Sequence, residues 1–306
     1  MLFRNGALSF VARFVHDGEM SRTNGSILST LVLALVTLAP GACGDDGGNS
    51  GTSVTLDGTT DGDPGTTAGT SSDTATGNLP TTGGEDNTDD VVEIAIRRLN
   101  PGQDVDAFAA ARDAFVALLK AQPGVGTDRE FASFLDYAVF MPPDPPVFIG
   151  MTQYDSLADF SAAGAAVGAS AEAGAFFSTF APELFTVLTP LEAGSPVDLA
   201  GVADAPGQVL EIAVRDLSSY PNFDPADYAA KRDAFLALLA QQPGFVAEYQ
   251  WVSALEPDIA VGMTVYASAD AFAAIGMDMN FLGSPEVDAF IGGYPPTGGH
   301  VNAVIK

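Results

Sequence analysis

The chain switches between two hydrophobic periods, and it does so twice in the same order. Residues 91–98 and 209–217 alternate apolar and polar positions and are rich in β-branched side chains, which predicts a strand in each place. Apolar residues then recur at helical spacing and define one face of a helix. These are Phe108, Ala111, Phe115, Leu118 and Leu119 in the first copy, and Tyr228, Phe235, Leu238 and Leu239 in the second.

Turn and cap residues bound both helices. Asp104 or Asp106 can cap the first, and Asp224 followed by Pro225 can cap the second. Pro-Gly pairs at 123–124 and 243–244 end the two helices.

The remaining elements also come in matching sets. Strands are predicted at 130–140, 147–154 and 184–189, and again at 245–254, 259–266 and 299–305. Ala-rich helical stretches lie at 156–167, 172–180, 268–276 and 285–291. The order β-α-β-β-α-β is that of the ferredoxin-like split unit, so the predicted fold is α+β with two tandem ferredoxin-like domains.

The repetition is visible in the letters themselves. RDAFVALLKAQPGV at 112–125 answers RDAFLALLAQQPGF at 232–245, and GMTQYDSLADFSAAG at 150–164 answers GMTVYASADAFAAIG at 262–276. The predicted repeats span 91–192 and 208–306, with a Pro/Gly/Ala-rich linker at 193–207. We expect their sheets to stack face to face within one chain, which makes the protein a monomeric pseudo-dimer.

The first strand of each repeat has two different faces. Val92, Ile94 and Ile96 share one face, as do Leu210, Ile212 and Val214. The other face carries Glu93, Ala95 and Arg97, or Glu211, Ala213 and Arg215. The aliphatic face is predicted to lie under the helices. The Glu/Arg face then points toward the opposed sheet, where it either forms ion pairs across the interface or lines a ligand cavity.

The N-terminal 43 residues are predicted to be an export signal. The apolar run at 27–39 is short for a membrane span, and Gly41 and Ala42 precede Cys43. This resembles a bacterial lipoprotein signal, which implies lipidation of Cys43. Pro40 stands where such signals normally carry an aliphatic residue. The alternative is an ordinary cleaved signal with an incidental cysteine.

Two further expectations concern the same end of the chain. Met20 opens a signal of ordinary length, so we expect translation to start there. Residues 44–90 are acidic and rich in Gly, Ser and Thr, so we expect a disordered tether. Together these features predict a folded part anchored to a bacterial envelope membrane, on its periplasmic or cell-surface face, through a lipid only.

Composition excludes several classes of function. There are 39 Asp and Glu against 12 Lys and Arg, and a net charge of −27 repels nucleic acid. The single cysteine forms no internal disulfide. His16 and His300 are the only histidines, which argues against a His-based metal site. The sequence contains no phosphate-binding loop, dinucleotide fingerprint or nucleophile elbow.

Each copy runs from a strand and an amphipathic helix through Gln-Pro-Gly into a strand, an acidic turn and a strand that ends in an aromatic residue. This pattern resembles the antibiotic biosynthesis monooxygenase-like superfamily, whose members form dimeric α/β barrels. The resemblance implies that the two repeats of this chain pack as an intramolecular dimeric α/β barrel. The pocket of such proteins lies between sheet and helices or inside the barrel. Some members oxidise polycyclic phenols without a cofactor, so the resemblance implies a small apolar or aromatic ligand and no cofactor. Haem degradation, found in other members, is disfavoured because His300 is the only imidazole of the mature chain.

The second copy has the better site candidates, all on predicted strands: Tyr249, Trp251, Tyr266, His300 and Asn302. The resemblance implies that aromatic and Asn side chains hold a phenolic substrate, and Tyr154 and Tyr266 stand where the family often has Trp. Asn302 could bind a phenolate and His300 could act as a general base, although a surface position for His300 is the alternative. Glu211 and Arg215 are candidates for ligand binding. The first copy lacks any Trp and is predicted to be the degenerate half.

Three functions follow as hypotheses. The first is a membrane-tethered protein that binds a small apolar or aromatic molecule, and the second is a cofactor-independent monooxygenase acting on aromatic or phenolic compounds. The third is a non-catalytic structural or interaction module. The first two require a cavity between the sheets that Tyr249, Trp251 or His300 can reach, whereas an interior packed solid favours the third.

Overall fold

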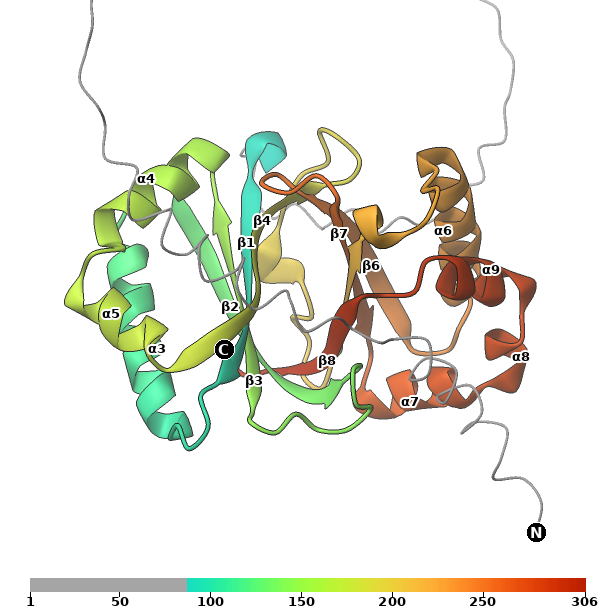
Figure 1. The fold of residues 1–306 in the computed structure, drawn as a ribbon, viewed down its shortest axis with the longest axis horizontal. Coiled ribbons are helices and arrows are strands. Elements are labelled where there is room, and N and C mark those ends of the chain that lie inside the picture. The colour runs from blue at the N-terminus through green and yellow to red at the C-terminus, as the bar shows by residue number, and fades with distance from the viewer. Residues whose placement is uncertain (1–86) are drawn as a thin grey trace, which may run out of the picture.

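A computed structural model describes residues 87–306. Figure 1 shows a central barrel of strands with helices on two opposite sides. The first half contains β1 (Val91–Leu99), α3 (Val105–Leu119), β2 (Val125–Asp136), β3 (Val147–Tyr154), α4 (Leu157–Val167), α5 (Ala171–Phe177) and β4 (Phe180–Pro190). The second contains β5 (Val209–Asp216), α6 (Pro225–Leu239), β6 (Phe245–Ser253), β7 (Ile259–Tyr266), α7 (Ala269–Met277), α8 (Met279–Leu282), α9 (Pro285–Gly293) and β8 (Gly298–Val304). Short 3₁₀ turns lie at Asn87–Asp89, Leu199–Gly201 and Leu217–Ser219.

The strands form one closed antiparallel barrel in the order β1-β3-β2-β8-β5-β7-β6-β4. Each half contributes four neighbouring strands, and the halves meet edge to edge where β2 pairs with β8 and β4 pairs with β6. The expected barrel is thus confirmed, but its halves join along their edges, so the expectation of two separate sheets stacked face to face is wrong. Edge pairing satisfies the backbone groups that two open sheets would leave exposed, and this closure is the physical advantage of a barrel.

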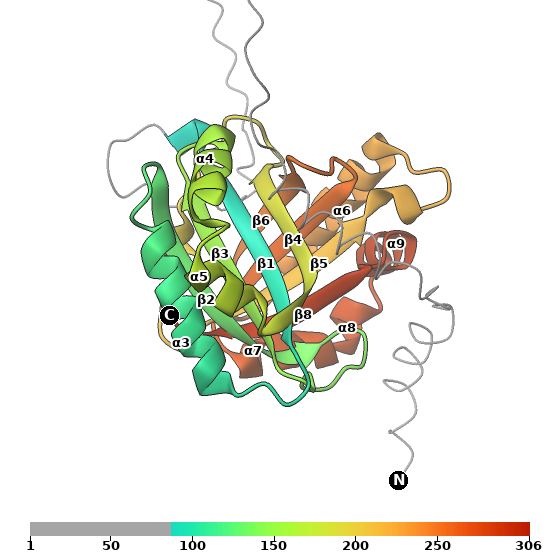
Figure 2. The same cartoon turned by 60° about the vertical axis from the view of Figure 1, so that its left-hand side comes forward.

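Helices cover the outside of the barrel. Figures 1 and 2 show α3, α4 and α5 over the first half and α6 to α9 over the second. Asp104 caps α3 by accepting a 2.8 Å hydrogen bond from the Ala107 backbone N–H, and Asp224 caps α6 with Pro225 in the first turn. The two amphipathic helices are thus confirmed, and the choice of cap in the first is settled. No helix within residues 87–306 is long and apolar enough to cross a membrane.

The boundaries of several elements differ from the predictions. β2 starts at Val125, directly after Gly124, and ends at Asp136 instead of running from 130 to 140. The Asp136 carboxylate accepts the Ala138 N–H at 2.8 Å, and Phe140 has a φ of 52°, so the chain turns where continued alternation was expected. Residues at the end of the predicted helix 172–180 belong to β4, and the short helix α8 was not predicted.

The two faces of the first strands lie opposite to the prediction. Ile94 and Ile212 belong to one buried cluster drawn from both halves, which fills the barrel interior. The Glu/Arg face lies under the helices, where the Arg97 guanidinium carbon is 5.6 Å and 5.3 Å from the ring centroids of Phe108 and Phe176. Both faces are buried, so the period of alternation alone could not tell which one faces inward. On the first strands the aliphatic face is turned to the interior, and on the helix side Arg97 finds the partner for its charge in Glu130.

The interior of the barrel is well filled. Its cluster of buried side chains includes Met151, Leu188, Trp251 and Met263 from the strands. The segment between the halves adds Val197, Leu199, Val202 and Ala203 to the same cluster. The first two hypotheses required a binding cavity between the sheets, and the filled interior does not provide it. A ligand site for this protein therefore has to lie elsewhere on the barrel.

Candidate functional site

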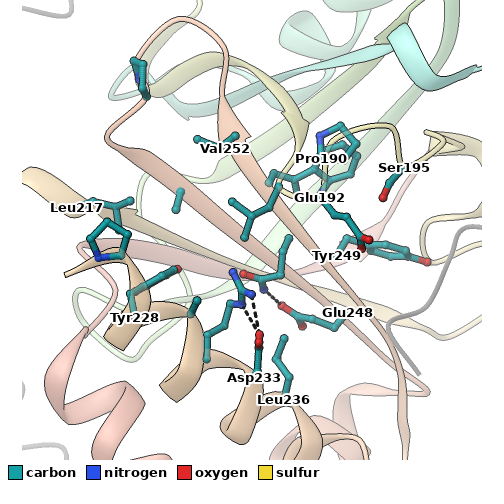
Figure 3. Close-up of a pocket in the computed structure, with 18 of the residues that line it drawn as sticks. Pro190, Glu192, Ser195, Leu217, Tyr228, Asp233, Leu236, Glu248, Tyr249 and Val252 are labelled. Atoms are coloured by element: carbon teal, nitrogen blue, oxygen red, sulfur yellow. Dashed lines mark hydrogen bonds and ion pairs between the residues drawn. The ribbon is translucent and has the colours of Figure 1, made fainter. Parts of the chain in front are cut away.

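A cleft lies outside the barrel core, in the second half. It has a volume of about 650 Å³ and is bounded by α6, β6 and residues 190–196. Figure 3 shows Tyr228, Asp233 and Leu236 of α6 facing the strand that carries Glu248 and Val252, while Pro190, Glu192 and Ser195 close the other side. A volume of this size is typical of pockets that hold small organic ligands.

The cleft exists because the seam between β4 and β6 is short. The pairing covers only Leu188 with Ser253, Thr189 with Val252, and Pro190 with Trp251. Two further backbone bonds flank these pairs, from the Ala254 N–H to the Val187 carbonyl at 2.8 Å and from the Leu191 N–H to the Gln250 carbonyl at 2.9 Å. Beyond Leu191 the chain leaves the ladder. The N-terminal half of β6 is left without a strand neighbour on that side, and the cleft occupies the gap.

Two predicted ligand-binding residues line this cleft. Tyr249 and Trp251 both border it from β6, and Trp251 is 3% exposed. On the facing helix, the guanidinium carbon of Arg232 lies 5.9 Å from the centre of the Tyr228 ring. Nη2 of the same side chain forms an ion pair with the Asp233 carboxylate at 2.6 Å. The walls therefore combine aromatic rings with a few charged groups, which suits a flat, largely apolar ligand.

Glu248 is a titratable group in the wall of the cleft that the sequence analysis did not predict. Burial raises the pKa of its carboxyl to about 7, and the charge of Glu211 adds to the shift. Hydrogen bonds from Thr264 and Gln250 and the charge of Arg215 lower the pKa in part. The residue is half-buried and borders the cleft. A carboxylate with a pKa near neutrality can accept a proton from a ligand and return it.

One signal in the sequence could have revealed Glu248. It lies on the face of β6 opposite to Tyr249 and Trp251, and its counterpart in the first copy, Asp128, is also acidic. Burial raises the pKa of Asp128 as well. An acid at the same strand position in both copies, on the side that faces the helices, marks a buried carboxylate.

A second, smaller pocket of about 40 Å³ adjoins the cleft. Both are bordered by Glu248 and Gln250, and the small pocket is also lined by Glu211 and Arg215. Two more predicted ligand-binding residues therefore lie behind Glu248, on the side of the sheet that faces α6 and α9. Tyr266 is buried next to them and lines neither space.

Tyr266 holds the Glu211 carboxylate of the smaller pocket in place. Its hydroxyl donates a 2.5 Å hydrogen bond to Glu211, and Tyr137 from the first half donates to the same carboxylate. Burial raises the pKa of both phenols well above 10, so they stay protonated as donors. In the first half Tyr154 bonds Glu93 in the same way, at 2.6 Å.

His300 and Asn302 lie elsewhere. They face the barrel interior from β8, and β5 and β7 separate that strand from β6. His300 is 3% exposed, with Nε2 3.0 Å from Glu183 and Nδ1 3.1 Å from Ser133, so the alternative of a surface position is wrong. Asn302 is fully buried and donates to the Leu210 and His300 carbonyls. The structure thus separates this pair from the residues that border the cleft.

The first half has an ion pair where the second half has a pocket. One Arg97 nitrogen, Nη2, lies 2.7 Å from both oxygens of Glu130, and both side chains are almost fully buried. This pair lies within one half, under its helices. The interpretation in which Arg97 pairs across the interface between the halves is therefore wrong.

Two further predictions from the sequence concern metal binding and the N-terminal residues. Within residues 87–306 no group of three or more His, Cys, Asp and Glu side chains could hold a metal ion. Cys43, the export signal at 1–43, Met20 and nearly all of the tether at 44–90 lie outside the described residues.

No protein-family model matches the sequence, and no curated protein matches it significantly. Solved structures do match. A protein of Lactobacillus acidophilus NCFM, provisionally described as a monooxygenase, is 12% identical with a TM-score of 0.39, covering 71% of this chain and 93% of its own. A chlorite dismutase mutant from Candidatus Nitrospira defluvii is 8% identical with a TM-score of 0.45, covering 71% and 92%. A mutant of SnoaB, a cofactor-independent oxygenase from Streptomyces nogalater, is 15% identical with a TM-score of 0.28, covering 34% and 95%.

Proposed function

We propose that the cleft of the second half binds a small apolar or aromatic molecule and that Glu248 accepts a proton from it. The observation that carries this proposal is the position of Glu248, a half-buried residue whose carboxyl has a pKa of about 7, in the wall of a cleft of about 650 Å³. A base with this pKa is half ionised at neutral pH and is therefore effective in both directions of proton transfer.

The reaction we propose is cofactor-independent oxygenation of an aromatic or phenolic compound. Glu248 removes a proton from the substrate, and the resulting anion reduces O₂ directly. A ring CH₂ group plus O₂ then gives a ring carbonyl plus water, so the substrate supplies all the electrons and no flavin, haem or metal is required. Binding without turnover is the other form of the proposal, and the presence of the base at the cleft favours catalysis.

The rest of the molecule serves this site as a scaffold. We propose that the two halves are tandem ferredoxin-like repeats of an antibiotic biosynthesis monooxygenase-like type, which lets a single chain act as a monomeric pseudo-dimer. Element order and strand order support this, because each half runs β-α-β-β-α-β with its first strand between its third and fourth. The first half has the Arg97–Glu130 ion pair under its helices, and the second half has the cleft.

Oxygen uptake tests the catalytic proposal. The mature protein, without added flavin or metal, is expected to consume O₂ with a dihydroxy-aromatic compound such as a dihydroxyanthrone. Uptake should be unaffected by chelators and by removal of light. If a panel of such compounds binds in the cleft but none is oxidised, the protein is a binder and not an enzyme.

The lipid anchor is a separate prediction. We propose that Cys43 is lipidated and tethers the folded part to a bacterial envelope membrane. Cys43→Ser is expected to abolish incorporation of a labelled fatty acid and to release the protein from the membrane fraction. Labelling that persists in Cys43→Ser, or a wild-type protein that is soluble after export, would contradict this part of the proposal.

A further inference from the structure

The two seams where the halves join match residue by residue. β8 pairs with β2 at one seam, and β4 pairs with β6 at the other. The Ile305 N–H donates to the Glu130 carbonyl at 2.9 Å, and the Leu191 N–H donates to the Gln250 carbonyl at 2.9 Å. Glu130 and Gln250 correspond, because each lies six residues after the glycine that ends the first helix of its half. The two backbone bonds are therefore equivalent.

Opposite charges follow these two bonds. The next residue is Lys306 beside the first half and Glu192 beside the second. The Lys306 ammonium lies 2.9 Å from the Asp113 carboxylate of α3, so it links the seam to the helix. Asp113 corresponds to Asp233 of α6, since both follow the arginine of the repeated sequence RDAF. The second half thus has two carboxylates where the first half has an ion pair.

These two carboxylates belong to the cleft. Glu192 and Asp233 border it from opposite sides (Figure 3). Within residues 87–306 Glu192 forms no ion pair, and Asp233 pairs only with its neighbour Arg232. Glu248 adds a third carboxyl to the walls, and among the described residues Arg232 is the only Lys or Arg that borders the cleft. The acidic groups are therefore in excess.

Tyr249 is a second sign of negative potential in the cleft, which it borders from β6. Burial raises the pKa of its phenol to about 12, and the negative charges of Asp204 and Asp198 add to the shift. The charge of Glu248 acts in the same direction. Surroundings that disfavour a phenolate favour a cation, so a positively charged ligand suits this cleft better than an anion.

We propose that the cleft selects aromatic compounds that carry a cationic amino group, with the ammonium held by Glu192 and Asp233. This inference rests on the proposed function and names the ligand class of the same cleft. The ammonium takes the place that Lys306 has beside the first half, and the flat body lies along Tyr228 and Tyr249. An ammonium has three N–H donors and can therefore bond more than one carboxylate. Such charge-assisted bonds are roughly twice as strong as neutral ones.

The test compares three probes that share one ring system and differ in charge. At neutral pH 1-naphthylmethylamine is a cation, 1-naphthylmethanol is neutral and 1-naphthoate is an anion. In equilibrium dialysis we expect the mature wild type to bind the amine at least about tenfold more tightly than the alcohol. Naphthoate should bind more weakly than the alcohol. Added salt should reduce the preference for the amine, because it screens charges near the surface.

Two variants of Glu192 test the site itself. Glu192→Gln keeps the size of the side chain and should lower the preference for the amine to about threefold, since one of two carboxylates remains. Its affinity for the alcohol should not change. Glu192→Lys places at the seam the charge that Lys306 carries beside the first half, and it should abolish the preference. The matched control is Glu172→Gln, at an exposed position of α5 in the first half, which should leave the preference unchanged.

The outcomes separate the possible failures. Equal affinities of the wild type for amine and alcohol would overturn the cation site and leave the cleft as a site for neutral aromatic compounds. A preference that survives in both Glu192 variants, or that falls equally in Glu172→Gln, would also overturn it. If none of the three probes binds to the wild type, the proposed function fails together with this inference.

Discussion

Replacing Glu248 by glutamine is expected to lower kcat/KM for oxygen uptake at least about a hundredfold, because general bases contribute roughly 10²–10⁴ to rate. Glutamine preserves the size of the side chain and can keep a hydrogen bond to Thr264, but it accepts no proton. Binding of a ligand that cannot ionise should change little. The loss should therefore fall on the chemical step rather than on affinity for the aromatic body.

The matched control is Asp128→Asn, which makes the same chemical change at the corresponding position of the first half. It should leave oxygen uptake near the wild-type value, since Asp128 lines neither pocket of the second half. The wild-type rate should also rise with pH and level off above a pKa of about 7. Activity that survives in Glu248→Gln with an unchanged pH profile would remove Glu248 from the mechanism.

Glu248→Gln should raise the stability of the protein although it lowers its activity. The pKa of Glu248 rises from 4.5 when unfolded to about 7 when folded, so the folded state binds more protons between these values. Stability therefore falls as pH rises from about 4.5 to about 7, and above 7 the full cost is present. The shift corresponds to roughly 3 kcal/mol, and exposure to the cleft reduces this to about 1–2 kcal/mol. Glu248→Gln should be more stable than the wild type at pH 8 by that amount, a gain typical of active-site residues.

The second large effect is a loss of folding stability, which we expect when Glu130 is replaced. Glu130→Ala leaves the Arg97 guanidinium buried without its partner, and breaking a buried pair in this way costs about 3–5 kcal/mol. Arg97 keeps its contacts with the rings of Phe108 and Phe176, but these do not neutralise its charge. Urea denaturation followed by circular dichroism measures the loss as a lower midpoint at unchanged slope.

The second half provides the control for this prediction. Gln250→Ala removes the side chain at the corresponding position, where no ion pair exists, and should cost no more than about 1 kcal/mol. Glu130→Gln, which keeps a hydrogen-bond acceptor for Arg97, should fall between the two. Equal losses of stability in Glu130→Ala and Gln250→Ala would show that the ion pair does not stabilise the first half.

The fold was largely predictable because the sequence repeats. Two copies of one pattern predicted the same elements twice, and amphipathic helices with Asp caps and Pro-Gly stops are strong local signals. The way the halves join was not predictable in the same manner. Edge pairing of β2 with β8 and of β4 with β6 depends on contacts far apart in sequence, which hydrophobic period does not encode.

The site was predicted only in part, for an identifiable reason. Tyr249 and Trp251 were found because they are aromatic side chains on one face of a predicted strand, where the first copy has Arg129 and Phe131. Glu248 was missed because its importance comes from burial, which raises its pKa, and burial is a property of the folded sheet and helix. The Glu/Arg face was assigned to the wrong side because both faces of these strands are covered, and alternation then carries no directional information.

A cleft-filling variant tests the central claim most directly. Ala229 borders the cleft from α6, and its counterpart Ala109 occupies the same position in α3. Mass spectrometry of small molecules that co-purify with the mature protein should find an aromatic or largely apolar compound with the wild type and with Ala109→Trp. Ala229→Trp should be folded and should lack that compound. If the same compound stays bound to folded Ala229→Trp, the cleft of the second half is not the binding site and the account is contradicted.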